Sequence, residues 1–548
     1  MTSKKNSDVI YKSSSNILNE MRAGLIKGAG QDMERIKKRP LIAIANSHSE
    51  LTTGHAHLAG LGAKVKQGII AAGGEFAEFN VPAPCDGIAM AHDGMRYVLA
   101  QRDLIADIVE THVRSQAFDA VVFIAGCDKI NPGMMMAMGR LDLPSLFLAG
   151  GPGQMNIRNT PTFNGNIDHG NYFNSPLEFK ETFNCASCGA CEFMGTANTF
   201  QCLAEALGIC LPGSANIPAW HSDKLAAARA TGEHIVHLFK EGITARQIMT
   251  KEAFNNALVM NMAIGGSTNA ALHLPAIAHS AGIEMDIKAF ETVDHIPTLL
   301  AISPNGPYGV QDLWAAGGMP AVMKVMQSDL DTSCLTVTGL PLQATIDNAT
   351  ILNPKVIPER SKPNRQEPGI TVLRGNLAPE GCVIKQAGVK PELMYTSGPA
   401  ICFDSEDDAI NMIQDGKLKE GQVIVLRYMG PKGAPGMPEM LGATLALKVA
   451  GLSSASLITD GRFSGATSGP CVGHITPEAS NGGFIAFIED GDIITVDIKN
   501  RSIHCDVSDE EIEKRKQNWA PTIKPVAFGF MERYRKHVKT ASEGAILD

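Results

Sequence analysis

The first half of the chain alternates short apolar runs with longer segments in which apolar residues recur every three or four positions. Short, continuous apolar runs predict strands that are buried on both faces, and the longer periodic segments predict amphipathic helices. This alternation indicates crossover connections, and therefore a doubly wound α/β domain whose strands all point the same way. The expected strands are residues 41–45, 76–81, 120–125 and 145–149, and the expected helices are residues 57–72, 97–115 and 133–141.

The pattern changes beyond residues 352–369, a proline-rich and charged stretch that predicts a linker. Because 548 residues are too many for one core, we expect an α/β domain over residues 1–351 and a second domain over residues 370–548. Brief β-rich runs separated by glycine and proline predict that the second domain is a β-barrel or a sandwich. Its expected strands are residues 370–373, 382–385, 401–403, 423–428, 456–459, 483–487, 493–497 and 502–507.

Reactive residues follow two of the expected parallel strands. Cys127, Asp128 and Lys129 come directly after the third strand, and Cys85 and Asp86 come a few residues after the second. A buried cysteine is usually a small core residue, but a core cannot easily satisfy the neighbouring carboxylate and amine. Since ligands of open α/β sheets bind outside the carboxyl ends of the strands, we expect these side chains to converge at one edge.

A second group of cysteines has the spacing of an iron–sulfur site. Cys185, Cys188 and Cys191 are each separated by two residues, although Gly195 stands where the ferredoxin pattern has its fourth cysteine. Three thiolates suffice to bind a cluster in which one iron must stay open to a substrate. A zinc site is the alternative, but no second cysteine pair lies at zinc-ribbon distance.

Composition and charge argue against a nucleic-acid-binding, membrane-spanning or secreted protein. The formal net charge of −9 is spread without a basic block, so nucleic acid is not an expected partner. No apolar run reaches the roughly 18 residues of a membrane span, and the first residues lack the apolar segment of a secretory signal. Twelve cysteines in such a chain indicate thiol or metal chemistry rather than disulfides. We therefore expect a cytoplasmic protein.

Three loops outside the cysteine segments also carry candidate chemistry. The rigid loop 430–439 ends in Glu439, and the loop 460–469 presents Ser464 among small residues. Ser464 lacks the Gly-x-Ser-x-Gly context of a hydrolase, so a hydrolase triad is not expected. Residues 264–269 contain a glycine pair that fits an anion-binding nest and close helix packing equally well.

Thiolates select iron–sulfur clusters, whereas carboxylates select a hard cation such as magnesium. Both are needed to remove water from a 2,3-dihydroxy acid, because the C2 proton is weakly acidic and hydroxide is a poor leaving group. Magnesium would stabilise the charge that develops on the substrate, and an open iron would act as a Lewis acid on the C3 hydroxyl. A serine could take the C2 proton only as an alkoxide, which requires an adjacent cation to lower its pKa.

Four stretches, at residues 127–134, 189–198, 430–439 and 458–465, together resemble the dihydroxy-acid dehydratase and phosphogluconate dehydratase family. The resemblance extends from about residue 15 to residue 540. It implies an α/β domain followed by a β-barrel domain, in a homodimer or a dimer of dimers.

The resemblance also implies a role for each site residue. Cys127 and Cys191 would bind the iron–sulfur cluster, and Ser464 would be the base. Magnesium would be held by Asp86, Asp128, Glu439 and Lys129, the last carboxylated on its amine.

The third cluster ligand distinguishes branches of the family. Members with a [2Fe-2S] cluster have a cysteine in the segment where this chain has Gly54. Cys85, however, is similar to a cysteine of the phosphogluconate and sugar-acid branch, which favours a [4Fe-4S] cluster. We predict Cys85 as the third ligand, in preference to Cys185 and Cys188.

The expected protein is thus a hydro-lyase that converts 2,3-dihydroxy acids to 2-oxo acids. The segments 430–440 and 458–474 resemble the branch that serves valine and isoleucine biosynthesis. A sugar-acid dehydratase acting on an aldonate or 6-phosphogluconate is the alternative within the family, and an iron–sulfur redox protein is the alternative from another class.

Overall fold

The computed structural model describes residues 4–154, 185–452, 454–465, 467 and 469–548. Its N-terminal part contains a four-stranded sheet of order β2-β1-β3-β4, in which every neighbouring pair is parallel. The predicted parallel α/β sheet is therefore confirmed. The strands are β1 (Leu41–Asn46), β2 (Glu75–Asn80), β3 (Ala120–Ala125) and β4 (Ser145–Ala149).

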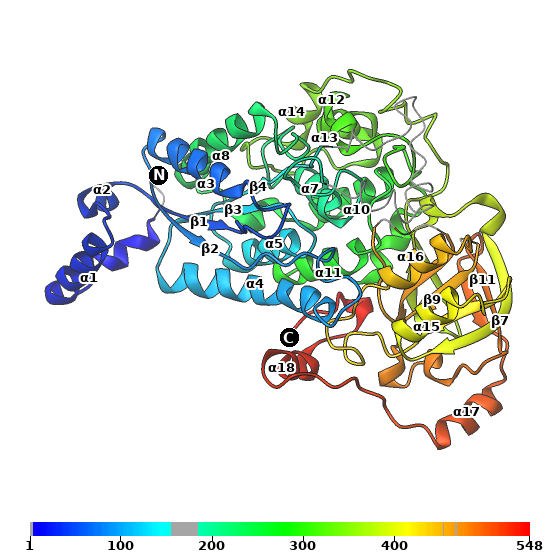
Figure 1. The fold of residues 1–548 in the computed structure, drawn as a ribbon. Coiled ribbons are helices and arrows are strands. Elements are labelled where there is room, and N and C mark those ends of the chain that lie inside the picture. Colours follow the sequence, from blue (N-terminus) through cyan, green and yellow to red (C-terminus); the bar gives the residue numbers. More distant parts are fainter. Residues whose placement is uncertain (1–3, 155–184, 453, 466, 468) are drawn as a thin grey trace.

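Helices cover both faces of this sheet. Figure 1 shows α3 (Leu58–Ala71) and α8 (Ser222–Glu241) on one side and α4 (Met95–Ser115) and α5 (Ile130–Leu141) on the other. All residues of β1 and β3 are consequently buried, which is why their sequences are apolar without alternation. The other helices of this part are α1 (Asn16–Gly28), α2 (Met33–Lys38), α7 (Thr196–Ala206), α9 (Ala245–Ile248), α10 (Lys251–Ala263), α11 (Ala270–Ser280), α12 (Val310–Ala315), α13 (Gly318–Val325) and α14 (Leu342–Asp347).

The C-terminal part contains a closed barrel of order β10-β6-β5-β12-β11-β7-β8-β9, as the β-rich pattern predicted. Closure leaves no unpaired edge strand in the barrel. Its strands are β5 (Thr371–Gly375), β6 (Ala378–Ile384), β7 (Tyr395–Phe403), β8 (Val423–Leu426), β9 (Ser456–Thr459), β10 (Cys471–Thr476), β11 (Ile493–Asp497) and β12 (Ser502–Cys505), and its helices are α15 (Glu406–Gln414), α16 (Leu441–Val449), α17 (Asp509–Gln517) and α18 (Phe530–His537).

Two details of the barrel differ from the sequence prediction. Residues 483–487, expected as a strand, contain the 3-10 helix Phe484–Phe487. A Cβ at Gly483 would meet the Pro477 carbonyl at 1.8 Å, so the chain makes a close turn there. Strand β10 was not predicted, because Gly473 and a left-handed His474 (φ 60°) interrupt its pairing with a register shift.

The barrel has apolar clusters of its own, but Val372 of β5 and Val383 of β6 pack in the core of the α/β part. The end of the chain also returns to the α/β part. Buried Arg102 on α4 donates hydrogen bonds to the carbonyls of Gly544 and Ala545. The division into domains at residues 352–369 stays a prediction. Among the described helices, none combines the length and the apolar character needed to cross a bilayer.

Candidate metal and thiol site

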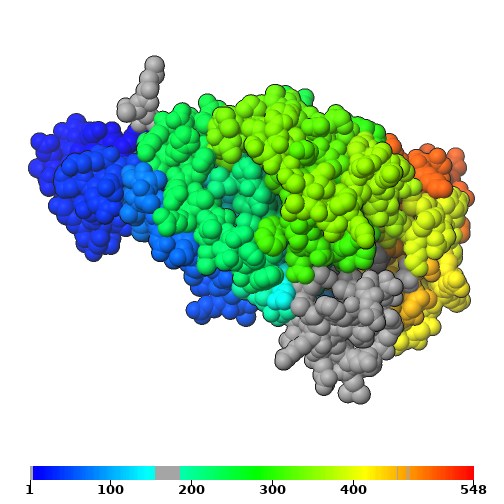
Figure 2. All heavy atoms as spheres, turned by 90° about the horizontal axis from the view of Figure 1, so that it is seen from above, coloured from blue at the N-terminus to red at the C-terminus, as the bar shows by residue number. Residues whose placement is uncertain are grey.

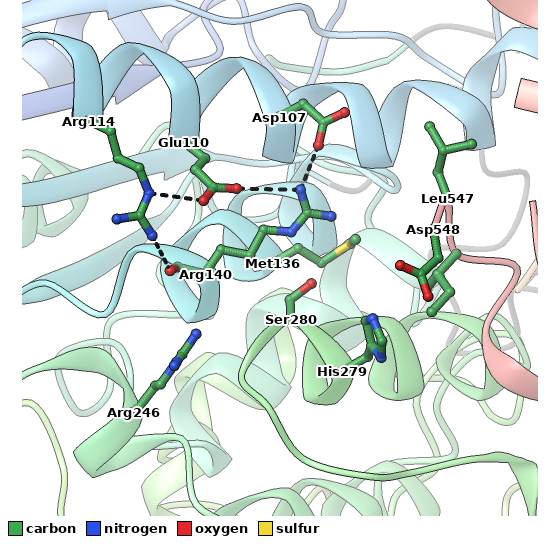
Figure 3. A pocket seen from close by; sticks show the side chains of 11 residues that line it. Asp107, Glu110, Arg114, Met136, Arg140, Arg246, His279, Ser280, Leu547 and Asp548 are labelled. Atoms are coloured by element: carbon green, nitrogen blue, oxygen red, sulfur yellow. Dashed lines mark hydrogen bonds and ion pairs between the residues drawn. The ribbon is translucent and has the colours of Figure 1, made fainter. Parts of the chain in front are cut away.

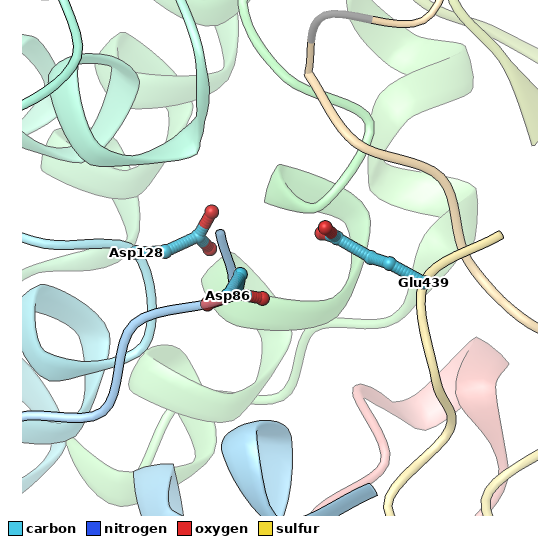
Figure 4. A group of neighbouring side chains, drawn as sticks. All are labelled: Asp86, Asp128 and Glu439. Atoms are coloured by element: carbon cyan, nitrogen blue, oxygen red, sulfur yellow. The ribbon is translucent and has the colours of Figure 1, made fainter. Parts of the chain in front are cut away.

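Three carboxylates from distant parts of the chain meet between the sheet and the barrel. Asp86 follows β2, Asp128 follows β3, and Glu439 lies in the loop before α16. One oxygen of each lies within 4.8 Å of those of the other two, so the group could hold a metal ion. Figure 4 shows the three side chains converging on a common point from different segments.

The ammonium of Lys129 lies next to all three carboxylates. It is fully buried, 3.0 Å from Asp86 and 3.8 Å from Glu439, and it forms an ion pair with Asp128. Burial and Arg462 act to lower the pKa of Lys129, but the three carboxylates outweigh them and hold it above its usual value. Burial raises the pKa of Asp128 to about 7, against the opposing effect of Lys129.

Arg462 was not identified from the sequence, although it lies two residues before Ser464. Its fully buried guanidinium donates to Glu439 Oε1 at 2.5 Å and to Asp86 Oδ2 at 3.2 Å. Its Nε donates to the carbonyl of Met437 at 2.7 Å, which fixes the plane of the guanidinium. Burial of an arginine requires ion pairs of this kind, and a single arginine in a loop sequence does not reveal them.

The two carboxylates that bind Arg462 each keep one oxygen away from it. Asp86 Oδ2 accepts from Arg462 and Lys129, whereas Asp86 Oδ1 is buried and has no hydrogen-bond partner among the described residues. The hydrogen bonds found for the Glu439 carboxylate, from Arg462 and Asn269, both go to Oε1. An unsatisfied buried carboxylate oxygen is costly, and a hard cation is the ligand that would satisfy it.

Thiols lie beside the carboxylates. The thiol of Cys127 donates a hydrogen bond to Cys85, which lowers the pKa of Cys85 to about 6 although burial opposes the shift. The pKa of Cys127 is raised, first by this same hydrogen bond and then by burial, and Cys191 raises it further through its charge. Cys191 interacts through its charge with Cys85 and with Cys127, so the three predicted cluster ligands lie in one region of the structure.

The other two cysteines of the segment differ in position. Cys185 is hydrogen-bonded to Thr53 and lies close enough to Cys85 for the two charges to interact. Burial raises the pKa of Cys188, and no other thiol contributes to that shift. The choice of Cys85 over Cys185 as a ligand stays a prediction. All twelve cysteines are free thiols.

Gly54 lies beside Cys127, one of the predicted cluster ligands. A Cβ at this position would lie 3.7 Å from Cys127 Cβ, 3.7 Å from the Gly189 carbonyl and 3.8 Å from Ala190 Cα. These are ordinary van der Waals distances, so the position accepts a Cβ. A side chain at residue 54 would begin next to the side chain of Cys127.

Ser464 is half-buried in the barrel loop that also supplies Arg462. The carbonyl of the next residue, Gly465, accepts a hydrogen bond of 2.7 Å from the ammonium of Lys385. Lys385 is buried, and burial lowers its pKa to about 7. Two basic side chains, Arg462 and Lys385, are thus anchored within two residues of Ser464, and the sequence had indicated neither.

A separate pocket between α4, α5, α11 and the end of the chain contains none of the predicted site residues (Figure 3). Its charged side chains largely pair with one another. Arg140 lies 2.6 Å from Asp107, and Arg114 lies 3.0 Å from Glu110. We assign no chemistry to this pocket.

Comparisons with known proteins agree with the geometry. Residues 39–345 match the family model described as dihydroxy-acid/6-phosphogluconate dehydratase N-terminal, and residues 355–545 match the corresponding C-terminal model. The chain is similar to a dihydroxy-acid dehydratase from Halothermothrix orenii, with 44% identity over 96% of this chain and 97% of the relative. It is 46% identical to a dihydroxy-acid dehydratase from Caldanaerobacter subterraneus subsp. tengcongensis, over 93% of this chain and 94% of the relative.

Proposed function

Because the chain belongs to the dihydroxy-acid/6-phosphogluconate dehydratase family, we propose that it is a hydro-lyase that converts branched-chain 2,3-dihydroxy acids to 2-oxo acids. This reaction would place it in valine and isoleucine biosynthesis. The observation that carries the proposal is the convergence of Asp86, Asp128 and Glu439 beside the thiols of Cys85 and Cys127. The names of the relatives favour this substrate class.

Two cofactors fit the residues present. Asp86, Asp128 and Glu439 would hold Mg²⁺, and the unsatisfied Asp86 Oδ1 supports this assignment. Cys85, Cys127 and Cys191 would hold an iron–sulfur cluster, [4Fe-4S] in preference to [2Fe-2S]. When bound, the cation would stabilise negative charge on the substrate, and an iron with an open position would assist departure of the C3 hydroxyl.

Lys129 would carry a carboxylate on its amine when the site is loaded. Carboxylation requires a neutral amine, yet three carboxylates hold Lys129 as an ammonium. Removing that positive charge would leave Asp86 and Glu439 facing Arg462 alone. We therefore propose that, only after a divalent cation has bound, Lys129 loses a proton and the neutral amine adds CO₂ with release of a second proton, because the cation offsets the added negative charge.

Ser464 would act as the base. Arg462 and, while it is protonated, Lys385 lie next to this loop, and positive charge near the serine would favour the alkoxide over the hydroxyl. The C2 proton of the substrate would pass to Ser464 Oγ while the C3–O bond breaks. The proton taken up by Ser464 Oγ would leave with the hydroxide as water, which restores the alkoxide. The enol would then give up its C2 hydroxyl proton and gain one at C3 to give the 2-oxo acid.

Sugar acids are the second candidate substrates, because Cys85 and Asp86 are similar to the sugar-acid branch. An anaerobic assay of the purified protein with 2,3-dihydroxyisovalerate, gluconate, xylonate and 6-phosphogluconate separates the two. We expect release of 2-oxo acid from dihydroxyisovalerate, and none from the Ser464→Ala variant. Turnover of a sugar acid alone would replace the proposed substrate, and inertness towards all four would contradict the dehydratase assignment.

We further propose a homodimer, or a dimer of two dimers, in the cytoplasm. Helix α1 supports the oligomer because three side chains one turn apart on one face, Ile17, Met21 and Leu25, are 61–76% exposed. The N-terminal arm that carries them forms a lobe at one end of the molecule (Figure 2). The twelve free thiols support a reducing compartment.

A further inference from the structure

Asn269 lies where the α/β part meets the barrel at the site. It is the N-cap of α11 and is completely buried. Its side-chain amide donates to Glu439 Oε1 at 3.0 Å and to Thr196 Oγ1 at 3.0 Å. The same nitrogen is 3.5 Å from the carbonyl of Phe463, the residue before Ser464. One neutral side chain therefore contacts a carboxylate of the metal group and the backbone of the serine loop.

The glycine pair before Asn269 serves to place it. Gly265 has a left-handed backbone (φ +62°), and a Cβ on Gly266 would meet the side chain of Asn261 at 2.2 Å. The amide of Ser267 already donates to Thr199 Oγ1, so it is not available to an anion. The sequence left an anion nest and close packing open, and these contacts favour close packing.

The amide of Asn269 also connects to the cysteine segment. Thr196, which accepts one of its hydrogen bonds, is the first residue of α7. Two residues later, Asn198 donates to the carbonyls of Cys191 and Phe193. The first turn of α7 thus holds the Cys191 segment on one side and Asn269 on the other.

The serine loop packs against the same turn. A Cβ on Gly465 would lie 2.8 Å from Gly195 Cα and 3.3 Å from Ser267 Oγ, so the backbones touch. Ser267 in turn is hydrogen-bonded to Thr196 and accepts from the amide of Asn269. One small set of hydrogen bonds consequently connects the Cys191 segment, the Glu439 carboxylate and the Ser464 loop.

We infer that Asn269 is a positioning residue that fixes Glu439 and the Ser464 loop relative to the Cys191 segment. The inference rests on the proposed function, since it concerns the spacing of groups that would act on one substrate. Asn269 carries no charge, so its replacement changes the position of Glu439 without changing the net charge of the site. Outer hydrogen-bond partners of metal ligands typically contribute 10- to 100-fold to metal affinity.

The test compares Asn269→Leu and Asn269→Ala with wild type and with Asn261→Ala. Leucine has nearly the shape of asparagine but no hydrogen-bond donors. Asn269→Leu therefore tests the same hydrogen bonds if Asn269→Ala folds poorly. Asn261 is a matched control because it is also a completely buried asparagine, in the preceding helix α10, and its side chain has no hydrogen-bond partner in the described chain. Cluster-containing, EDTA-treated protein is titrated with MnCl₂ by electron paramagnetic resonance, and kcat and KM are measured with saturating Mg²⁺.

We expect both Asn269 variants to bind Mn²⁺ about 10- to 100-fold more weakly, with a lowered kcat and unchanged visible absorption of the cluster. Asn261→Ala should bind Mn²⁺ as wild type does. Wild-type Mn²⁺ affinity in both Asn269 variants, or an equal loss in Asn261→Ala, would overturn the role of Asn269. This outcome differs from a failure of the proposed function. In that case the wild-type protein itself would neither bind Mn²⁺ nor release 2-oxo acid.

Discussion

Arg462 and Asp86 are 376 residues apart in the sequence, yet a guanidinium nitrogen of Arg462 lies 3.2 Å from a carboxylate oxygen of Asp86. The same nitrogen lies 2.5 Å from Glu439. All three side chains are buried. This contact joins a loop of the barrel to the edge of the parallel sheet, and it leaves the other oxygen of Asp86 without a partner among the described residues.

Replacing Arg462 with methionine should destabilise the metal-free protein by about 3–5 kcal/mol, because it leaves Lys129 as the one remaining cation beside the buried carboxylates of Asp86 and Glu439 in the part of the chain that the structure describes. Saturating Mg²⁺ should reduce this loss, since a bound cation would neutralise the same carboxylates. Denaturant unfolding with and without Mg²⁺ measures both effects.

Arg374→Met is the control: its ion pair with Glu291 is partly exposed, so the change should cost less than about 1 kcal/mol. A loss for Arg462→Met no larger than the control would contradict the proposed importance of this ion pair.

Cys85→Ser should abolish the visible absorption of the iron–sulfur cluster, whereas Cys185→Ser should retain it. Cys85 is hydrogen-bonded to Cys127, while Cys185 is exposed and hydrogen-bonded to Thr53. Anaerobic reconstitution followed by absorption spectroscopy and iron analysis measures the outcome. The reverse pattern would make Cys185 the ligand.

Gly54→Cys should restore cluster absorption to the Cys85→Ser variant. A Cβ at residue 54 lies 3.7 Å from Cys127 Cβ without a clash, so a cysteine there would add a thiol beside Cys127. Gly54→Ala in the same background has no thiol and is the matched control. Equal absorption of the cysteine and alanine double variants would exclude residue 54 as a ligand position.

Much of this site could be predicted from the sequence because it depends on parallel strands. Continuous apolar runs identified β1 and β3, and strand direction placed Asp86 and Asp128 at one edge of the sheet. The resemblance to a family, rather than any pattern, suggested that Glu439 and Ser464 join them.

Arg462, Asn269 and Lys385 could not be predicted in this way. Their importance depends on burial against partners from the other half of the chain, and residue type alone predicts that arginine, asparagine and lysine are exposed. Strand β10 was missed for a local reason, since the left-handed backbone of His474 breaks the alternation on which strand prediction relies.

Lys385 should make stability depend on pH. Burial lowers its pKa to about 7 in the folded protein, whereas an unfolded lysine titrates near 10.4. Between these values the unfolded state binds more protons, so the free energy of unfolding should rise with pH. Relative to Lys385→Met, the free energy of unfolding of the wild type should increase by up to about 4 kcal/mol between pH 7 and pH 10.

Denaturant unfolding of both proteins across this range measures the difference, and Lys390→Met, at an exposed lysine nearby, is the control. A constant difference between wild type and Lys385→Met would show that Lys385 is not a buried, titrating amine.

Met21→Lys combined with Leu25→Lys should shift the protein from dimer to monomer if α1 forms the interface between two copies. Met21 is 61% and Leu25 76% exposed, so a charge at either position costs little in the single chain. In an interface the same charges would be buried without partners, which strongly disfavours association. Light scattering coupled to size-exclusion chromatography measures the mass. Glu20→Lys, on a polar position of the same helix, is the control and should leave the mass unchanged. A double variant that keeps the wild-type mass would place the interface on another surface.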